Sequence, residues 1–319
     1  MSSVVAMATI LTARSKAASL SRLTFWTPLT LRTYCRAAAS ISSEVAIGSS
    51  PRRVVMLRHM SRTVPPAVSG RPGANRVGAM TTDITIDITI DTAEGPMPAL
   101  LGTPTNPPRG GIVVVQEAFG LTPHIGAVCD RLAGAGWLAV APALFHRTGS
   151  PVLGYGDFDA LAPHFMAITA EGIGTDLSAA LGVLDDAGLS ARQRGVVGFC
   201  MGGTLAFWAA TTFQLGAAVT FYGGGVATGR FGLPSMLEMA GQLDAPWQGH
   251  FGDLDEGIPI DQVEALRAAL ADAHVPTELH RYADAGHGFN CDDRDAFHEP
   301  SATEAWARTL AWFDAHLPD

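Results

Sequence analysis

A run of four consecutive apolar residues, Ile112 to Val115, and the regular alternation of strand and helix signals after it constrain the fold of this chain most. A continuous apolar run of strand length is typical of a strand buried on both faces, as in parallel sheets. Before it, Ile84, Ile86, Ile88 and Ile90 alternate with Thr and Asp, which predicts a strand with one solvated face.

The alternation continues to the end of the chain. Further strands are expected near residues 97–102, 111–116, 137–142, 194–199, 216–221, 246–251 and 277–282. Helices are expected near residues 122–135, 172–187, 201–213, 260–273 and 301–316. In the last helix, Ser301 and Glu304 have the spacing of a capping box. This pattern predicts a single α/β domain: a mostly parallel, doubly wound sheet with helices on both faces and functional groups at the carboxyl ends of its strands.

Charge divides the chain near Met80. Residues 1–80 hold 11 of the 21 lysines and arginines and one acid, Glu44, whereas the rest has 10 arginines against 29 acids. The first segment has the Arg-rich, Ser-rich composition of a transit peptide, or is the upstream extension of an over-long reading frame with a second start at Met80. On either interpretation we expect disorder in 1–80 and a folded domain over 81–319.

The composition also narrows the partners and the chemistry. The acidic domain argues against nucleic acid and anionic membranes, and no stretch has the ~18 uncharged apolar residues of a membrane-spanning helix. We expect a cytoplasmic monomer or small homo-oligomer. The four cysteines form no disulfide or zinc pattern, and Lys16 is the only lysine, so Schiff-base and P-loop chemistry are not expected in the domain.

The sharpest local signal is Gly198-Phe199-Cys200-Met201-Gly202-Gly203, which lies between an apolar strand and a helix. This is the nucleophile-elbow pattern with cysteine in place of serine. Glycines permit the tight turn, and the helix directs its amides and positive dipole end at the sulfur, which favours the thiolate. The alternative is a buried structural cysteine.

Two later loops hold a base and an acid in the order that this pattern requires. His287 is flanked by Gly286 and Gly288, and Asp255 lies in the loop before the helix near residue 260, with Asp253 as the second choice. A thiol nucleophile needs an imidazole as general base and a carboxylate to orient that imidazole. We therefore predict a Cys200, His287, Asp255 triad.

Several motifs together resemble the dienelactone hydrolase family. They occur in family order over residues 81–319: Val115 to Leu121, Pro123 to Ile125, Ala141 to Phe145, Gly198 to Gly203, Asp255 before Pro259, and Gly286 to Phe289. The resemblance implies an α/β-hydrolase fold and hydrolysis of a small-molecule ester or lactone without metal or organic cofactor.

The resemblance also implies roles for further residues. Glu117 would contact the nucleophile and take part in its activation, the backbone amides of Met201 and Ala118 would form the oxyanion hole, and Phe119 and Tyr222 would line the pocket. The alternatives are a solvated acid for Glu117 and a core residue for Tyr222.

The arginines that clamp a substrate carboxylate in this family have no clear counterpart. Cys291 stands four residues beyond His287, where the family has one arginine, and no arginine or lysine lies between Gly149 and Leu189. Arg147 could substitute, with a different spacing. A thiol does not replace a bidentate guanidinium. The alternatives are therefore an esterase or thioesterase for a neutral apolar acyl group, and, from another class, a thiol redox or non-catalytic binding protein.

Overall fold

The computed structural model describes residues 85–318, and within them one eight-stranded sheet with the order β1-β2-β4-β3-β5-β6-β7-β8. The β1 to β2 and β2 to β4 pairs are antiparallel and all other pairs are parallel. The strands are Thr85–Thr92 (β1), Gly95–Gly102 (β2), Gly111–Val115 (β3), Leu138–Pro142 (β4), Arg194–Phe199 (β5), Ala217–Phe221 (β6), Trp247–Gly252 (β7) and Thr277–Tyr282 (β8). The predicted extension, residues 1–80, lies outside the described residues.

Burial follows the apolar pattern of each strand. Every residue of β3, β4 and β6 is buried, as expected for strands covered on both faces. In β1 only one face is buried: Ile88 and Ile90 point into the core, whereas Asp87 and Asp91 are exposed. The predicted mostly parallel, doubly wound α/β sheet is confirmed.

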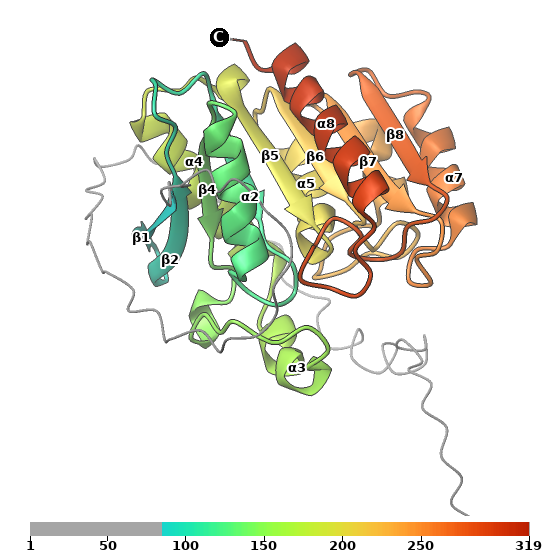
Figure 1. Ribbon diagram of the computed structural model, residues 1–319, viewed down its shortest axis with the longest axis horizontal. Helices are drawn as coiled ribbons and strands as arrows, with labels where there is room; N and C mark the ends of the chain where they lie inside the picture. Colours follow the sequence, from blue (N-terminus) through green and yellow to red (C-terminus); the bar gives the residue numbers. More distant parts are fainter. Residues whose placement is uncertain (1–84, 319) are drawn as a thin grey trace, which may run out of the picture. The chain divides into compact units, whose positions relative to one another are not determined.

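Helices cover both faces of the sheet (Figure 1). Helices α2 and α8 lie over one face, and α4 and α5 lie over the other. The main helices are Pro123–Gly134 (α2), Ala170–Asp186 (α4), Met201–Thr212 (α5), Ile260–Leu270 (α7) and Glu299–His316 (α8). Their connections place the loops after β3, β5, β7 and β8 at the carboxyl edge of the sheet.

Three local features differ from the sequence prediction. Two helices were not predicted, Phe158–Met166 (α3) and Met236–Met239 (α6). The prediction of a capping box at Ser301 and Glu304 is wrong, because α8 begins at Glu299. The Ser301 hydroxyl contacts the His298 imidazole at 2.8 Å, and Glu304 pairs with Arg308. Because a proline is tolerated in the first helical turn, Pro300 lets the helix start earlier than the serine.

The turn between β5 and α5 depends on glycines. A Cβ on Gly202 would lie 2.2 Å from the carbonyl oxygen of Val115, and one on Gly198 would lie 1.9 Å from the carbonyl oxygen of Gly202. No side chain fits at either position, so the start of α5 approaches the end of β3 at backbone contact distance. This close approach sets the position of the residue between them, Cys200.

We predict that Gly202→Ala lowers the free energy of unfolding by about 3 kcal/mol, because the methyl group must displace backbone rather than a movable side chain. Gly134→Ala is the matched control, since no atom lies within 4 Å of its Cβ position in the last turn of α2. There alanine is expected to be neutral or to stabilise by up to about 1 kcal/mol. Urea unfolding of both variants checks this, and equal effects would contradict the backbone contact.

Candidate active site

Cys200 lies at the junction of β5 and α5 in a backbone conformation that ordinary residues seldom adopt. Its φ is 55° and its ψ is −113°, and its amide donates to the carbonyl of Phe221 on the neighbouring strand at 3.1 Å. The side chain is partly exposed. Strained non-glycine residues concentrate at functional sites, and the sulfur here sits at the positive end of a 12-residue helix.

His287 and Asp255 reach this sulfur from two other loops at the same edge of the sheet. Nδ1 of His287 lies 2.6 Å from Oδ2 of Asp255, and the imidazole also hydrogen-bonds the Cys200 side chain. Asp255 is buried, and its other carboxylate oxygen accepts from the Gly257 amide at 2.9 Å. The structure thus brings the three predicted triad residues together. Asp253, the second choice, instead forms a bidentate pair with Arg281 at 2.7 Å.

The charge state of His287 is set by its two partners. Burial alone would lower its pKa, but the negative charge of the Cys200 thiolate and the hydrogen bonds to Asp255 and Cys200 outweigh burial and raise the pKa to about 10. His287 is therefore an imidazolium at neutral pH. Burial raises the pKa of the Cys291 thiol to about 11, and that of Cys129 still further. Of the three described cysteines, Cys200 is the one that is partly exposed and lies beside an imidazole.

Two backbone amides are available beside the sulfur. Met201 is the first residue of α5, so its amide has no intrahelical acceptor. Ala118 follows β3 in the loop that Gly202 contacts through Val115 and Gln116. The glycine contact therefore holds the two predicted oxyanion-hole donors on adjacent backbone segments.

Glu117 is fully buried next to these amides, and its hydrogen-bond partner is a residue that the sequence analysis missed. Its Oε1 lies 3.3 Å from Nη1 of Arg294, and its Oε2 has no partner among the described residues. Burial raises the pKa of Glu117, although the charges of Arg294 and His287 oppose this. Arg294 lies seven residues beyond His287, so a search at a fixed family spacing did not find it.

Aromatic rings form the rest of the site. The Tyr222 ring is fully buried with its centroid 5.2 Å from that of His287, and its φ is 37°. The Phe119 ring is 4.9 Å from that of Tyr155, and the Arg294 guanidinium lies over both rings at 5.7 and 5.4 Å. Tyr155 also contacts the Cys291 sulfur through its hydroxyl, at 3.2 Å. Tyr222 thus lies beside His287, and Phe119 lies beside Tyr155 and Arg294.

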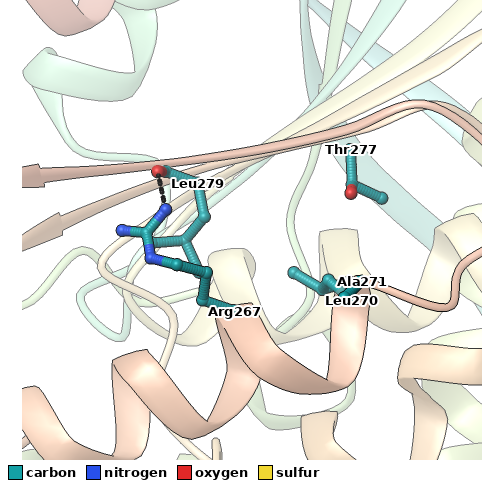
Figure 2. Close-up of a pocket in the computed structure, with 5 residues that line it drawn as sticks. All are labelled: Arg267, Leu270, Ala271, Thr277 and Leu279. Atoms are coloured by element: carbon teal, nitrogen blue, oxygen red, sulfur yellow. Dashed lines mark hydrogen bonds between the residues drawn. The ribbon is translucent and has the colours of Figure 1, made fainter.

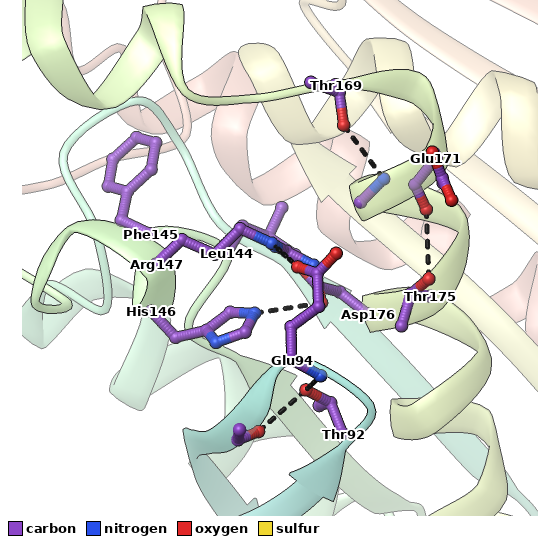
Figure 3. A network of polar contacts seen from close by, with 12 residues as sticks. Thr92, Glu94, Leu144, Phe145, His146, Arg147, Thr169, Glu171, Thr175 and Asp176 are labelled. Carbon is purple, nitrogen blue, oxygen red and sulfur yellow. Dashed lines mark hydrogen bonds and ion pairs between the residues drawn. The ribbon is translucent and has the colours of Figure 1, made fainter.

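Arg147 does not belong to this group, which corrects the prediction that it binds substrate (Figure 3). It lies in a short 3-10 turn, His146–Thr148, and its guanidinium contacts both carboxylate oxygens of Asp176 at 2.7 and 3.1 Å and also pairs with Glu94. His146 contacts the same Asp176 at 3.0 Å. Arg147 therefore ties the loop after β4 to α4 and to the β1–β2 turn.

A small hollow between α7 and β8 is separate from the triad. It is lined by Arg267, Leu270, Ala271, Thr277 and Leu279, and the Arg267 guanidinium donates to the Leu279 carbonyl at 2.8 Å (Figure 2). Thr277 begins β8, so the hollow opens toward the amino end of that strand, whereas Cys200 lies at the carboxyl edge.

Fold and site together define an α/β hydrolase with a cysteine at the nucleophile position. The profile of the "Dienelactone hydrolase family" matches residues 97–317, and the chain belongs to this family. It is accordingly an enzyme of the class that hydrolyses ester or lactone bonds. Within residues 85–318, none of the helices combines the length and apolar character needed to span a bilayer.

Similar proteins carry related names. The chain is 38% identical over 205 residues to a "Putative carboxymethylenebutenolidase" of Salmonella typhimurium, covering 63% of this chain and 76% of that protein. It is 34% identical over 235 residues to a protein of the same name from Yersinia pestis, covering 72% and 88%. A crystal structure titled "Putative Dienelactone Hydrolase" from Klebsiella pneumoniae matches with a TM-score of 0.67 and 36% identity, covering 72% of this chain and 98% of that one.

We predict that Asp176→Ala lowers the free energy of unfolding by about 3 kcal/mol or more, because it leaves His146 and Arg147 without their shared, buried counter-charge. Asp186→Ala at the exposed end of the same helix is the control and should change stability by less than about 0.5 kcal/mol. Chemical denaturation compares the two, and similar small losses in both would show that the network contributes little.

We also predict that iodoacetamide at pH 7 alkylates Cys200 much faster than Cys129 or Cys291, whose buried thiols stay protonated. Asp255→Asn removes a charge that raises the pKa of His287, so it should slow alkylation of Cys200 several-fold. Peptide mapping by mass spectrometry assigns each modified cysteine, including Cys35, which lies outside the described residues. Equal labelling of Cys200 and Cys291 would contradict a thiolate held by His287.

Proposed function

We propose that this enzyme hydrolyses a small-molecule carboxylic ester or lactone through a covalent acyl-enzyme on Cys200. The observation that carries the proposal is the 2.6 Å contact of Asp255 with an imidazole whose other contact is the Cys200 sulfur. Thiolate, imidazolium and carboxylate in this order are the groups that acyl transfer requires. Family membership supports the bond type, and the relatives named as carboxymethylenebutenolidases support a lactone among the substrates.

The first half of the reaction forms the acyl-enzyme. The Cys200 thiolate attacks the carbonyl carbon, and the carbonyl oxygen takes up the negative charge between the amides of Met201 and Ala118. The intermediate then collapses as the bond from carbon to the leaving oxygen breaks, and the His287 imidazolium gives that oxygen its proton. An ester releases its alcohol, whereas a lactone keeps its hydroxyl on the bound acyl chain.

The second half returns the enzyme to its initial state. Neutral His287 takes a proton from a water molecule, the resulting hydroxide attacks the thioester, and Cys200 leaves as a thiolate. The products are a carboxylic acid and an imidazolium that again faces the thiolate. Asp255 keeps the imidazole in one orientation throughout and stabilises its positive charge. Glu117 is buried beside the oxyanion donors. Its charge interacts with those of Arg294 and His287, so its protonation state and that of His287 depend on each other.

We predict that Cys200→Ala and His287→Ala each lower kcat/KM for p-nitrophenyl acetate at least about 1000-fold, and that Cys200→Ser retains weak activity because the site is arranged for a thiolate rather than an alcohol. Cys129→Ala in the core of α2 is the control and should keep near-parental rates. A lactone panel run alongside tests the second bond type.

The outcomes separate hydrolysis from the alternative functions. Turnover by the parent that is lost in both variants, with an acylated Cys200 peptide on rapid acid quench, supports the proposal. A parent that turns over neither substrate class, and whose Cys200 is oxidised by dilute peroxide, would indicate a thiol redox protein instead. Near-parental rates in Cys200→Ser would show that the thiolate is not needed. Light scattering and cell fractionation test the predicted small oligomer and cytoplasmic location.

A further inference from the structure

The exposed large apolar side chains of residues 85–318 all lie in segments that follow the carboxyl ends of strands. Six such side chains are exposed: Val152, Phe158, Met166, Leu254, Ile260 and Phe297. Three follow β4, two follow β7 and one follows β8. They therefore gather at the edge of the sheet that carries Cys200. A contiguous group of exposed apolar side chains marks a binding surface, whereas apolar side chains that are exposed singly are normal.

Three of the six belong to the segment between β4 and α4 and define what we call the α3 rim: Val152, Phe158 and Met166, with exposed fractions of 59%, 43% and 67%. Helix α3 has no buried residue, although six of its nine residues are apolar. It lies beyond the carboxyl ends of the central strands, apart from the helices that cover the sheet (Figure 1). Leu161 and Phe165 of α3 pack against the core, whereas Phe158 and Met166 remain exposed.

The α3 rim is continuous with the catalytic centre through aromatic rings. The Phe158 ring lies 6.4 Å from that of Phe119, which in turn lies 4.9 Å from the ring of Tyr155. The Leu153 amide donates to the Phe119 carbonyl at 2.9 Å, so the rim segment is attached to the loop that holds Ala118. An apolar wall therefore runs from the oxyanion donors outward to α3.

Two arginines at this edge of the sheet contact protein carboxyl groups. Arg294, which lies over Phe119 and Tyr155, pairs with Glu117, and Arg147 pairs with Asp176 and Glu94. A substrate carboxylate would exchange with, or share, the contact that Glu117 makes with Arg294 and the contacts that Asp176 and Glu94 make with Arg147. A hydrocarbon chain or aromatic ring needs no such exchange, because it gains contact with the rings and the α3 rim directly.

We propose that the α3 rim binds the hydrocarbon part of an uncharged ester, and that Phe158 and Met166 set a preference for long apolar substrates over small carboxylated ones. The proposal rests on the ester hydrolysis proposed above and specifies its substrate class. The part of the substrate that the α3 rim binds is an apolar chain or ring, on either the acyl or the alcohol side of the ester. Complete burial of one methylene group raises the binding constant of the substrate about fourfold.

The test measures kcat/KM of the full chain in two series of esters. In the acyl series, p-nitrophenyl acetate, butyrate and octanoate vary the chain length, and p-nitrophenyl hemisuccinate matches butyrate in length but carries a carboxylate. In the alcohol series, ethyl acetate is compared with octyl acetate. We expect kcat/KM to rise at least tenfold from the short to the long member of one series. We also expect butyrate to exceed hemisuccinate at least tenfold.

Variants locate the preference on the molecule. Phe158→Ser should lower the ratio of long-chain to short-chain kcat/KM at least fivefold, and Met166→Ser should lower it in the same direction. Phe297→Ser is the matched control, since Phe297 is 39% exposed but lies outside the aromatic wall, and it should leave the ratio unchanged. Thermal unfolding verifies that each variant is folded, and exposure of the replaced side chains favours this.

Each other outcome overturns the proposal in a distinguishable way. Flat or falling rates along both series, or a preference for hemisuccinate, would refute the apolar substrate class while Cys200-dependent hydrolysis stands. Suppose that Phe158→Ser leaves the ratio of long-chain to short-chain kcat/KM unchanged and yet gives a smaller particle mass than the parent by light scattering. That result would identify the α3 rim as an interface between copies of the chain. Ester hydrolysis that survives in Cys200→Ala would refute the proposed function itself, and this substrate assignment with it.

Discussion

The site depends on one backbone contact, in which the first turn of α5 lies directly against the end of β3. Gly202 has no room for a Cβ beside the Val115 and Gln116 carbonyls, and Gly198 has none beside Gly202. A side chain at either position would push the helix away from the strand. The contact holds the Met201 amide near Ala118 and forces Cys200 into its positive-φ conformation, so the geometry of the nucleophile follows from the packing of two elements.

Conformational strain at Cys200 has a counterpart in the next strand. Tyr222 follows β6 as Cys200 follows β5, and its φ of 37° lies in the same sparsely populated range. The Cys200 amide donates to Phe221 and the Tyr222 amide donates to His250, so each strained residue is held by a hydrogen bond to the adjacent strand. The parallel sheet thus supplies the hydrogen bonds that offset the strain and places the Tyr222 ring beside His287.

Sequence reasoning succeeded where a residue's role depends on local pattern and chain order. Continuous and alternating apolar runs predicted the strands within a few residues, and the order of Cys200, Asp255 and His287 predicted which loops meet. Sequence reasoning failed where the role of a side chain depends on which distant residues the fold brings next to it. Arg147 follows the expected strand, but Asp176 from α4 is buried beneath it. Helix α3 was missed because it is only nine residues long and contains Pro163, a residue that usually ends a helix.

The ionisable groups at the centre bear on what the enzyme can bind. Asp255, Cys200 and Glu117 can each carry a negative charge, whereas His287 and Arg294 carry the two positive ones. Burial raises the pKa of Glu117, which favours its protonated form and brings the five groups toward neutrality. An incoming carboxylate would add a negative charge to this near-neutral set of groups, and its desolvation would have to be offset by the guanidinium of Arg294, which already contacts Glu117. A neutral ester adds no charge until its carbonyl oxygen becomes an oxyanion, which is the stage at which the amides of Met201 and Ala118 stabilise it most.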